Sequence, residues 1–171
     1  NDLKLYLKNK SNYHIIKPID SAGSRGVFKI NNKNLPKLKK NFLISKKFSK
    51  KNKVICEEYI KTDLPQIAGD AIILNKKIIF SHWGDQYYDK TINPLLPIGE
   101  SWPSSHNEIN IFFLEKELNR LFKKLKISFG VFNFDIRFTE NKKLMIIEIG
   151  PRNGGDYIAE VVKDATGVDM I

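Results

Sequence analysis

The sequence predicts an α+β protein built from antiparallel hairpins and amphipathic helices, and three observations indicate this fold class. Residues 130–139 alternate between two faces, as the residues of a half-buried strand do. Residues 108–126 place apolar side chains at the spacing of a helical stripe. The dipeptide Asn75-Lys76 divides residues 67–82 into two apolar segments, which predicts a β-hairpin.

The strand predicted at residues 130–139 has two different faces. One face is apolar and the other is mostly polar: Phe132, Phe134, Ile136 and Phe138 alternate with Val131, Asn133, Asp135 and Arg137. Because successive side chains of a strand point to opposite faces, we expect the aromatic set to enter the core. Asp135 then lies on the face away from that core.

The remaining elements can be assigned in chain order from apolar patterning and turn residues. We predict strands at residues 14–20, 27–30, 54–60 and 144–149, helices at 36–48 and 156–165, and an irregular loop at 84–106. Residues 61–65 are polar and turn-like. They suggest a boundary between a first lobe, residues 1–62, and a second lobe, residues 63–171.

The composition fits a cytoplasmic protein and speaks against a membrane protein and a nucleic-acid-binding protein. The formal net charge is +10, but 25 of the 29 basic residues are lysines scattered along the chain, as on solvated surfaces. No apolar segment approaches the roughly 20 residues that a membrane span needs. The chain does not begin with a signal-peptide pattern, and Cys56 is its only cysteine, which fits a reducing compartment.

A first candidate site combines Lys17, at the end of a predicted strand, with a loop of small residues at 21–26. Gly23 and Gly26 permit a close backbone approach, so that successive N–H groups can hold phosphate oxygens. Lys17 would add a positive charge. A glycine turn between two strands with no ligand explains the same pattern.

A second candidate site is the pair Glu57 and Glu58 near the end of the strand predicted at residues 54–60. A carboxylate at this position can accept a hydrogen bond from an adenine amino group, while backbone groups contact the ring edge. The alternative is a pair of acids on an exposed sheet edge.

The third candidate site is the strongest. Asp135 and Glu148 become close neighbours if their strands pair around a turn at residues 140–143, because cross-strand partners share a face. Two carboxylates repel unless a proton or cation intervenes, and a hard divalent ion with oxygen ligands would satisfy both. Arg152 and Asn153 follow in a glycine-rich loop, where Arg152 suits an anionic oxygen. Surface acids at strand ends are the alternative interpretation.

Taken in order, these three sites resemble the ATP-grasp superfamily, in its carbamoyl-phosphate-synthase-like, carboxylate–amine ligase branch. The matching stretches are IIKPIDSAGSRGVFKI, VICEEYI, GVFNFDIRFTENKKLMIIEIGPRNGG and ATGVD, which together extend over nearly the whole chain. The resemblance implies two α+β lobes with mainly antiparallel sheets that sandwich ATP, together with Mg²⁺ or Mn²⁺. It also implies a missing N-terminal domain of the same protein.

The resemblance implies a role for each site residue. Nucleotide contacts would come from Lys17, Ser21, Gly23, Ser24, Gly26, Glu57, Glu58 and Ile60, metal ligands from Asp135 and Glu148, and the substrate-binding catalytic residue is Arg152. Gly150 stands where many family members have a third metal ligand, an asparagine, and Asn153 is the candidate replacement. Position 135 carries Asp where Glu is common, and the shorter side chain would shift the coordination.

The implied reaction is ATP-dependent activation of a small carboxylic acid as an acyl phosphate, followed by attack of a nucleophile, an amine before a thiol. No Ser/His/Asp triad pattern is present, and the three histidines are not spaced like a metal site. Asp70, His82 and Asp85 are further candidates for substrate contacts. Two alternatives remain, a non-catalytic regulatory nucleotide-binding module and, behind it, a nucleic-acid-binding domain. The expected partners are small molecules, with no nucleic acid and no membrane.

Overall fold

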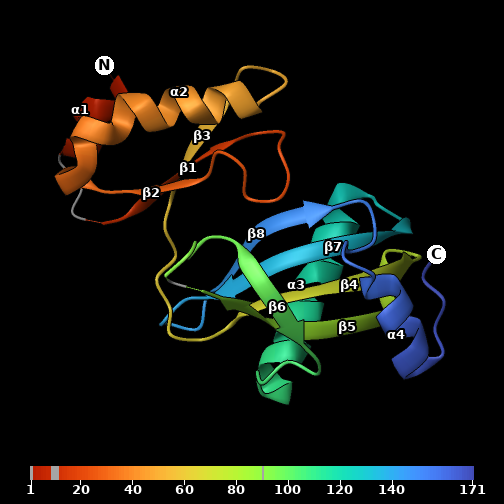
Figure 1. Cartoon of the computed structure of the whole chain (residues 1–171). Coiled ribbons are helices and arrows are strands. Elements are labelled where there is room, and N and C mark those ends of the chain that lie inside the picture. Colours follow the sequence, from red (N-terminus) through yellow and green to blue (C-terminus); the bar gives the residue numbers. More distant parts are fainter. Residues whose placement is uncertain (1, 9–11, 90) are drawn as a thin grey trace. The chain divides into compact units, whose positions relative to one another are not determined.

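The computed structural model describes residues 2–8, 12–89 and 91–171, and its contacts divide the chain into two compact units (Figure 1). The N-terminal unit comprises Asn1–Ile60 and Tyr88–Leu96, and the C-terminal unit comprises Lys61–Tyr87 and Pro97–Ile171. The sequence did not indicate that residues 88–96 belong with the N-terminal unit. One bond that links them to it runs from Ser24 Oγ to the Leu95 carbonyl, at 2.7 Å.

The N-terminal unit is a three-stranded antiparallel sheet with helices beside it. Its strands are β1 (His14–Pro18), β2 (Phe28–Ile30) and β3 (Val54–Glu58) in the order β2-β1-β3, and its helices are α1 (Asp2–Lys8), the 3₁₀ helix η1 (Asn32–Lys37) and α2 (Leu38–Phe48). Buried Leu7, Ile16, Ile30 and Leu38 form its core. The strands predicted at residues 14–20 and 27–30 are present as β1 and β2, which pair antiparallel as neighbours in the sheet.

The helix predicted at residues 36–48 begins two residues later as an α-helix. Pro36 lies inside η1, where the side chain of Asn31 accepts hydrogen bonds from the backbone N–H groups of Lys33 and Asn34. Proline has no N–H to donate to the α-helical ladder, so it suits this entry turn. Helix α1 was not predicted from the sequence.

The C-terminal unit is built on a five-stranded sheet in the order β6-β5-β4-β7-β8. Its strands are β4 (Gln66–Leu74), β5 (Lys77–Tyr88), β6 (Pro97–Ser101), β7 (Phe129–Phe138) and β8 (Leu144–Gly150). The predicted hairpin at Asn75-Lys76 joins β4 and β5, and both turn residues adopt positive φ angles, 51° and 64°. The prediction of an irregular loop at residues 84–106 is wrong for two segments, because β5 continues to Tyr88 and residues 97–101 form β6.

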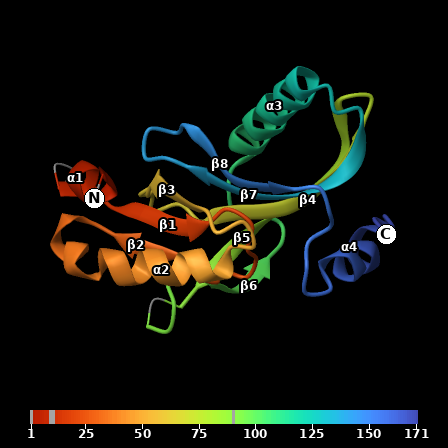
Figure 2. The ribbon, with the colours of Figure 1, turned by 90° about the horizontal axis from the view of Figure 1, so that it is seen from above.

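One face of this sheet packs on helix α3 (Glu108–Leu125), which runs along it in Figures 1 and 2. Leu114, Leu118 and Phe122 of α3 pack in one buried cluster with the inward side chains of the strands, among them Ile67, Trp83, Phe132, Phe134, Ile136 and Phe138. The predicted alternation of β7 is confirmed, because its aromatic residues are buried against α3. The short helix α4 (Ile158–Thr166) follows the loop after β8 and buries Ala159 and Val162.

The opposite face of the sheet carries polar and small side chains and is called the polar face below. It comprises His82, Gly84 and Gln86 of β5, Gln66, Ala68 and Asp70 of β4, Asn133, Asp135 and Arg137 of β7, and Glu148 and Gly150 of β8. Direct cross-strand partners share a face, so the register places these residues in rows across the sheet. Within the described part of the chain, no helix is long and apolar enough to cross a membrane.

The α3 contact predicts a large difference between two leucines of one helix. Leu118 is fully buried, whereas Leu125 is 56% exposed. We expect Leu118→Ala to lower the free energy of unfolding by about 2–5 kcal/mol, from lost burial and the cavity that remains. Leu125→Ala should cost less than about 1 kcal/mol. Urea denaturation of both variants tests this, and equal losses would contradict the packing of α3 on the sheet.

Candidate functional site

The two acids predicted to bind metal are direct neighbours in the C-terminal sheet. Asp135 of β7 is the cross-strand partner of Glu148 of β8, and the register shifts immediately beyond this pair, where Ile136 opposes Ile146. The shift leaves one extra residue, Ile147, in β8. Such a bulge bends the strand locally and redirects its side chains. The predicted juxtaposition of the two acids is therefore present, on the polar face.

The surroundings of Asp135 disfavour its negative charge. Burial, followed by repulsion from Glu148 and then from Glu100, raises the pKa of Asp135 to about 6, although hydrogen bonds from Gln66 and Gln86 act in the opposite direction. Burial raises a carboxyl pKa because the charged form loses solvation, and a nearby like charge adds to this effect. Asp135 is thus a carboxylate that a proton or a cation would stabilise.

A chain of polar side chains that the sequence analysis missed connects Asp135 to Arg137. Gln86 Nε2 donates to Asp135 Oδ1 at 3.1 Å and to Glu100 Oε1 at 2.9 Å. Gln66 Nε2 donates to Gln86 Oε1 at 2.7 Å, and Arg137 Nε donates to Gln66 Oε1 at 2.7 Å. The hydrogen bond from Gln66 orients the side-chain amide of Gln86, and the hydrogen bond from Arg137 orients that of Gln66. Since no sequence motif relates these residues, only the register of β4, β5 and β7 brings them together.

The glycine-rich loop after β8 holds Arg152 and Asn153 in different surroundings. Arg152 is exposed, and its Nη1 donates to the Asn153 carbonyl at 2.6 Å. The Asn153 side chain donates from Nδ2 to the Met170 carbonyl at 2.9 Å, while its buried Oδ1 has no hydrogen-bond partner among the residues that the structure describes. The side-chain amide of Asn153 is therefore anchored to the segment after α4.

Asp70, one of the weaker sequence candidates, is fully buried on the polar face. Its Oδ1 accepts from Asn133 Nδ2, and its Oδ2 accepts from the Gly154 backbone N–H, both at 2.8 Å. A Cβ at Gly154 would lie 3.2 Å from Asp70 Oδ2 and 3.0 Å from Ile158 Cδ1, so the close approach requires a glycine or a local shift. Asp70 thereby fixes the loop that carries Arg152.

Asp85, the other acid suggested as a substrate contact, accepts hydrogen bonds from the segment that follows β6. It accepts from Ser104 Oγ at 2.6 Å and from the Ser105 backbone N–H at 2.9 Å. Burial alone would raise the pKa of Asp85, but these hydrogen bonds outweigh burial and lower it. The carboxylate therefore anchors the segment between β6 and α3.

In the N-terminal unit, the predicted phosphate contact and the predicted adenine contact bind each other. Lys17 Nζ lies 2.7 Å from Glu57 Oε2, and both side chains are partly exposed. The strand register explains the contact, because Lys17 pairs with Ile55 and Glu57 lies two residues further along β3, on the same face. Glu58 is exposed and accepts from Asn12 Nδ2 at 3.2 Å.

The predicted phosphate loop, residues 21–26, has the backbone that its glycines permit. Gly23, Ser24 and Gly26 all adopt positive φ angles, 66°, 52° and 74°. A Cβ at Gly26 would lie 2.9 Å from the Phe48 ring, so glycine is required there for both conformation and space. Ser21 is partly buried, and Ile60 follows the end of β3. Three residues of the loop are therefore left-handed, two of them glycines, for which this conformation carries no steric cost.

The site residues form two groups, one in each unit. Lys17, the loop, Glu57 and Glu58 belong to the N-terminal unit, whereas the acids and the glycine-rich loop belong to the C-terminal unit. Among the described residues, no group of three or more His, Cys, Asp or Glu side chains is arranged to hold a metal ion. Asp135 and Glu148 therefore supply two carboxylates and no third.

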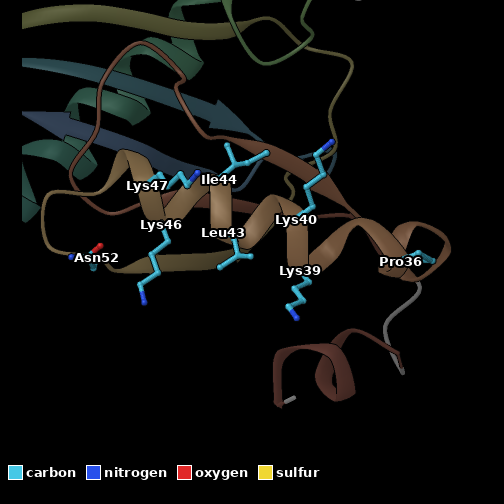
Figure 3. A pocket seen from close by; sticks show the side chains of 8 residues that line it. All are labelled: Pro36, Lys39, Lys40, Leu43, Ile44, Lys46, Lys47 and Asn52. Atoms are coloured by element: carbon cyan, nitrogen blue, oxygen red, sulfur yellow. The ribbon is translucent and has the colours of Figure 1, made fainter.

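One surface hollow lies in the N-terminal unit. It is a shallow groove of about 660 Å³ along α2, and Figure 3 shows the side chains that line it: Pro36, Lys39, Lys40, Leu43, Ile44, Lys46, Lys47 and Asn52. None of the residues predicted from the sequence to bind a ligand lines this groove. Lysine side chains project from α2 in Figure 3, as expected for a solvated helix.

The two antiparallel sheets with their helices define an α+β class of protein, and comparison with known proteins identifies the family. The family model that describes the ATP-grasp domain matches residues 4–156 of this chain. The chain belongs to the ATP-grasp family. The resemblance and the fold class predicted from the sequence are therefore confirmed. Among curated proteins, none matches the chain.

Solved structures of ATP-grasp enzymes share the fold. The biotin carboxylase domain of 2-oxoglutarate carboxylase from Hydrogenobacter thermophilus, solved with MgADP and bicarbonate, has a TM-score of 0.77 at 16% identity and matches 99% of this chain. An L-amino acid ligase from Bacillus licheniformis has a TM-score of 0.67 at 20% identity over 97% of the chain. The chain spans 37% and 38% of these proteins, respectively. At these identities the likeness establishes the fold alone.

The raised pKa of Asp135 predicts a stability effect that depends on pH. The folded state binds the proton more tightly than the unfolded chain, so the ionised carboxylate destabilises the fold above about pH 6, and this cost disappears below about pH 4. Without metal, Asp135→Asn should therefore raise the free energy of unfolding at pH 8 by about 2–3 kcal/mol. Denaturant titrations in EDTA at pH 8 and pH 4 measure the difference.

The matched control is Glu140→Gln, an exposed acid in the turn between β7 and β8. It should change stability by less than about 0.5 kcal/mol at either pH. A loss of stability in Asp135→Asn at pH 8, or a gain that is the same at pH 4, would show that repulsion and burial do not govern this carboxyl group.

Proposed function

We propose that this chain is the ATP- and Mg²⁺-binding part of an ATP-dependent ligase that joins a carboxylic acid to an amine. One observation carries the proposal: Asp135 and Glu148 are cross-strand partners, and the pKa of Asp135 is raised to about 6 partly by Glu148. Two carboxylates at directly paired strand positions repel each other, and the burial of Asp135 adds to the cost of its charge, so that a proton or a cation would stabilise the pair. Membership of the ATP-grasp family supports nucleotide binding at this pair.

The donor set fits Mg²⁺ or Mn²⁺. Mg²⁺ in proteins is usually held by one or two carboxylates and retains water or phosphate oxygens for its other positions. Asp135 and Glu148 supply two carboxylates of this kind, and the Asp135 orientation is set by Gln86. When bound, the ion would neutralise charge on the β- and γ-phosphates. We assign Asn153 only a weaker place in this set, because its amide is anchored to Met170.

The proposed reaction has two steps that require positioning and charge rather than a side-chain nucleophile. The substrate carboxylate attacks the γ-phosphorus of ATP, which forms an acyl phosphate and releases ADP. The amine then attacks the acyl carbon, the C–O bond to phosphate breaks, and inorganic phosphate leaves. Exposed Arg152 would bind the substrate carboxylate and the acyl phosphate oxygens.

The N-terminal unit would supply the remaining nucleotide contacts. The left-handed residues Gly23, Ser24 and Gly26 give the loop at residues 21–26 a backbone of the kind that can turn N–H groups toward phosphate oxygens. Lys17 would exchange its ion pair with Glu57 for a nucleotide phosphate, and Glu57 would then accept from the adenine amino group. Because the Lys17–Glu57 pair is partly exposed, breaking it costs little, on the order of 1 kcal/mol or less.

The second candidate is a regulatory module that binds nucleotide without catalysis. Such a module needs Lys17, the loop and Glu57 but has no requirement for paired acids. The retained pair of Asp135 and Glu148 favours the ligase, and the metal dependence of binding separates the two functions.

We predict that MgADP raises the melting temperature of this chain, because a ligand that binds only the folded state stabilises it. At an ADP concentration of about 100 times the Kd, the stabilisation is about 2.7 kcal/mol. Glu148→Gln should reduce the shift by most of its metal-dependent part, whereas Glu140→Gln, in the adjacent turn, should leave it unchanged. A thermal-shift titration with ADP, in Mg²⁺ and in EDTA, measures these effects.

Each outcome of this titration separates the candidates. A shift that is the same in Mg²⁺ and EDTA, and the same in Glu148→Gln, would favour the regulatory module. If neither the chain nor a longer form of the protein shows any shift with ADP or ATP, nucleotide binding itself is excluded. Manganese in place of magnesium tests whether the acid pair accepts either ion.

A further inference from the structure

The positive charge of the chain is concentrated in one segment of the N-terminal unit. Residues 21–56 carry 11 of the 29 basic residues and none of the 19 acidic residues. The rest of the chain has 18 basic residues (29 less 11) beside all 19 acidic ones, so it is nearly neutral. Although lysines occur along the whole chain, its net charge therefore arises in this segment, and helix α2 lies in the middle of it.

The outward side chains of α2 form two rows with the same order of chemistry. Each row runs lysine, aliphatic residue, lysine: Lys39, Leu43 and Lys46 in one, and Lys40, Ile44 and Lys47 in the other. The spacing of four and then three residues keeps each row on one side of the helix. Figure 3 shows the first row projecting from the lower side of α2. All six side chains line the groove along α2, which thus has an aliphatic centre and lysines at its corners.

The aliphatic centre of this groove is open to solvent. Leu43 is 48% exposed, and Ile44 is partly buried, whereas Leu38 and Ser45 are the residues that α2 buries within the unit. A single exposed leucine is common on protein surfaces. Here, however, all four residues that lie three or four positions from Leu43 are lysines. Residues at these spacings are its neighbours on the helix surface, so the leucine is enclosed by positive charge.

The lysines of this groove have no acidic partner among the residues that the structure describes. None of the ion pairs found there includes a lysine of α2. Acids of the same unit have other partners, since Asp20 accepts from the Lys51 backbone N–H and Glu57 pairs with Lys17. The charge around Leu43 is therefore left for solvent or a binding partner to compensate.

We propose that the α2 groove binds an acidic peptide segment of another protein, in which apolar residues lie between carboxylates. The two lysines of a row are seven residues apart, which corresponds to about 10 Å along the helix axis. Residues three positions apart in an extended peptide are also about 10 Å apart. A segment with acids at positions i and i+3 can therefore place its carboxylates at both lysines of a row, while the apolar residues between them cover Leu43 and Ile44.

Two other anionic partners fit the groove less well. Surfaces that bind single-stranded nucleic acid stack bases on aromatic rings or arginines, and the described residues that line this groove include neither. A lipid bilayer is flat, so it would meet the lysines but leave the hollow between them unfilled. None of the proposed nucleotide contacts lines the groove, so the proposal does not depend on the ligase function.

The experiment is a fluorescence-anisotropy titration of this chain with the peptide Glu-Glu-Leu-Leu-Glu-Glu, labelled with a neutral dye. We expect saturable binding at about 0.05 M salt and at least about tenfold weaker binding at about 0.5 M salt, because salt screens exposed charges. Two control peptides separate charge from apolar contact. Lys-Lys-Leu-Leu-Lys-Lys should not bind, and Glu-Glu-Ser-Ser-Glu-Glu should bind at least about threefold more weakly than the leucine peptide.

Two double variants test the groove itself. Lys39→Glu with Lys46→Glu reverses both ends of one row and should weaken binding at least about tenfold. The matched control is Lys116→Glu with Lys123→Glu on α3, which makes the same change in net charge at exposed positions with the same spacing. It should leave binding within about twofold. Leu43→Ser should weaken binding about threefold. Cooperative thermal unfolding checks that each variant is folded.

Four results would overturn the proposal. The absence of saturable binding of the leucine peptide excludes the site. Equal weakening in both double variants shows attraction to net charge rather than to the groove. Binding to phosphatidylserine vesicles or to a single-stranded oligonucleotide that exceeds peptide binding, and that only the α2 variant loses, assigns the groove to that partner instead. Self-association of the chain that only the α2 variant loses assigns it to a second copy.

The MgADP shift, measured in the same samples, keeps this proposal separate from the ligase proposal. It should be alike in the two double variants, because the groove lies outside the proposed nucleotide contacts. If the shift is present while the peptide does not bind, only the groove proposal is excluded. If the peptide binds while MgADP has no effect, only the proposed nucleotide binding is.

Discussion

The packing of the aromatic face of β7 on α3 is the constraint on which the acid pair Asp135 and Glu148 depends. The two acids face each other because the aromatic side chains of β7 are committed to the α3 side of the sheet. Successive side chains of a strand point to opposite faces, so burying the aromatic residues of β7 on one face places Asp135 on the other. The buried set of Phe132, Phe134, Ile136 and Phe138 therefore holds Asp135 against Glu148, and packing energy opposes a local electrostatic cost.

The polar chain around Asp135 limits that cost without removing it. Gln86 gives the carboxylate a neutral hydrogen bond, whereas Arg137, the nearby cation in this chain of contacts, donates to Gln66. A direct ion pair with an arginine would lower the pKa of Asp135 and would neutralise the site. Because two amide side chains, Gln66 and Gln86, lie between Arg137 and Asp135, the charge of Asp135 is not neutralised by the arginine. This arrangement suits a site that must attract a cation but stay structurally ordered when none is bound.

The sequence predicted most of the fold because its strongest signals are local. The alternation of β7, the stripe of α3 and the turn at Asn75-Lys76 each depend on neighbouring residues, and all are confirmed. Residues 84–88 were missed as strand because Gly84, Asp85 and Gln86 interrupt the apolar pattern, although β4 pairs with them. The links from Gln66 to Gln86 and from Asp70 to Gly154 also could not be predicted. They join residues 20 and 84 positions apart, and only the assembled sheet brings them into contact.

The charged site residues of the two units differ in their exposure to solvent, and this difference determines how strongly each charge is felt. Lys17 has a carboxylate partner in Glu57, and both remain partly exposed, so that solvent screens the pair and a phosphate can displace it at small cost. For Asp135, the described residues show no ion pair with a cation, and burial strengthens its repulsion from Glu148. Under the proposed function, a bound divalent cation would compensate the acid pair, and Lys17 would contact a nucleotide phosphate. Because Asp135 is buried whereas solvent screens the Lys17–Glu57 pair, most of the electrostatic gain on metal binding is expected at the acids.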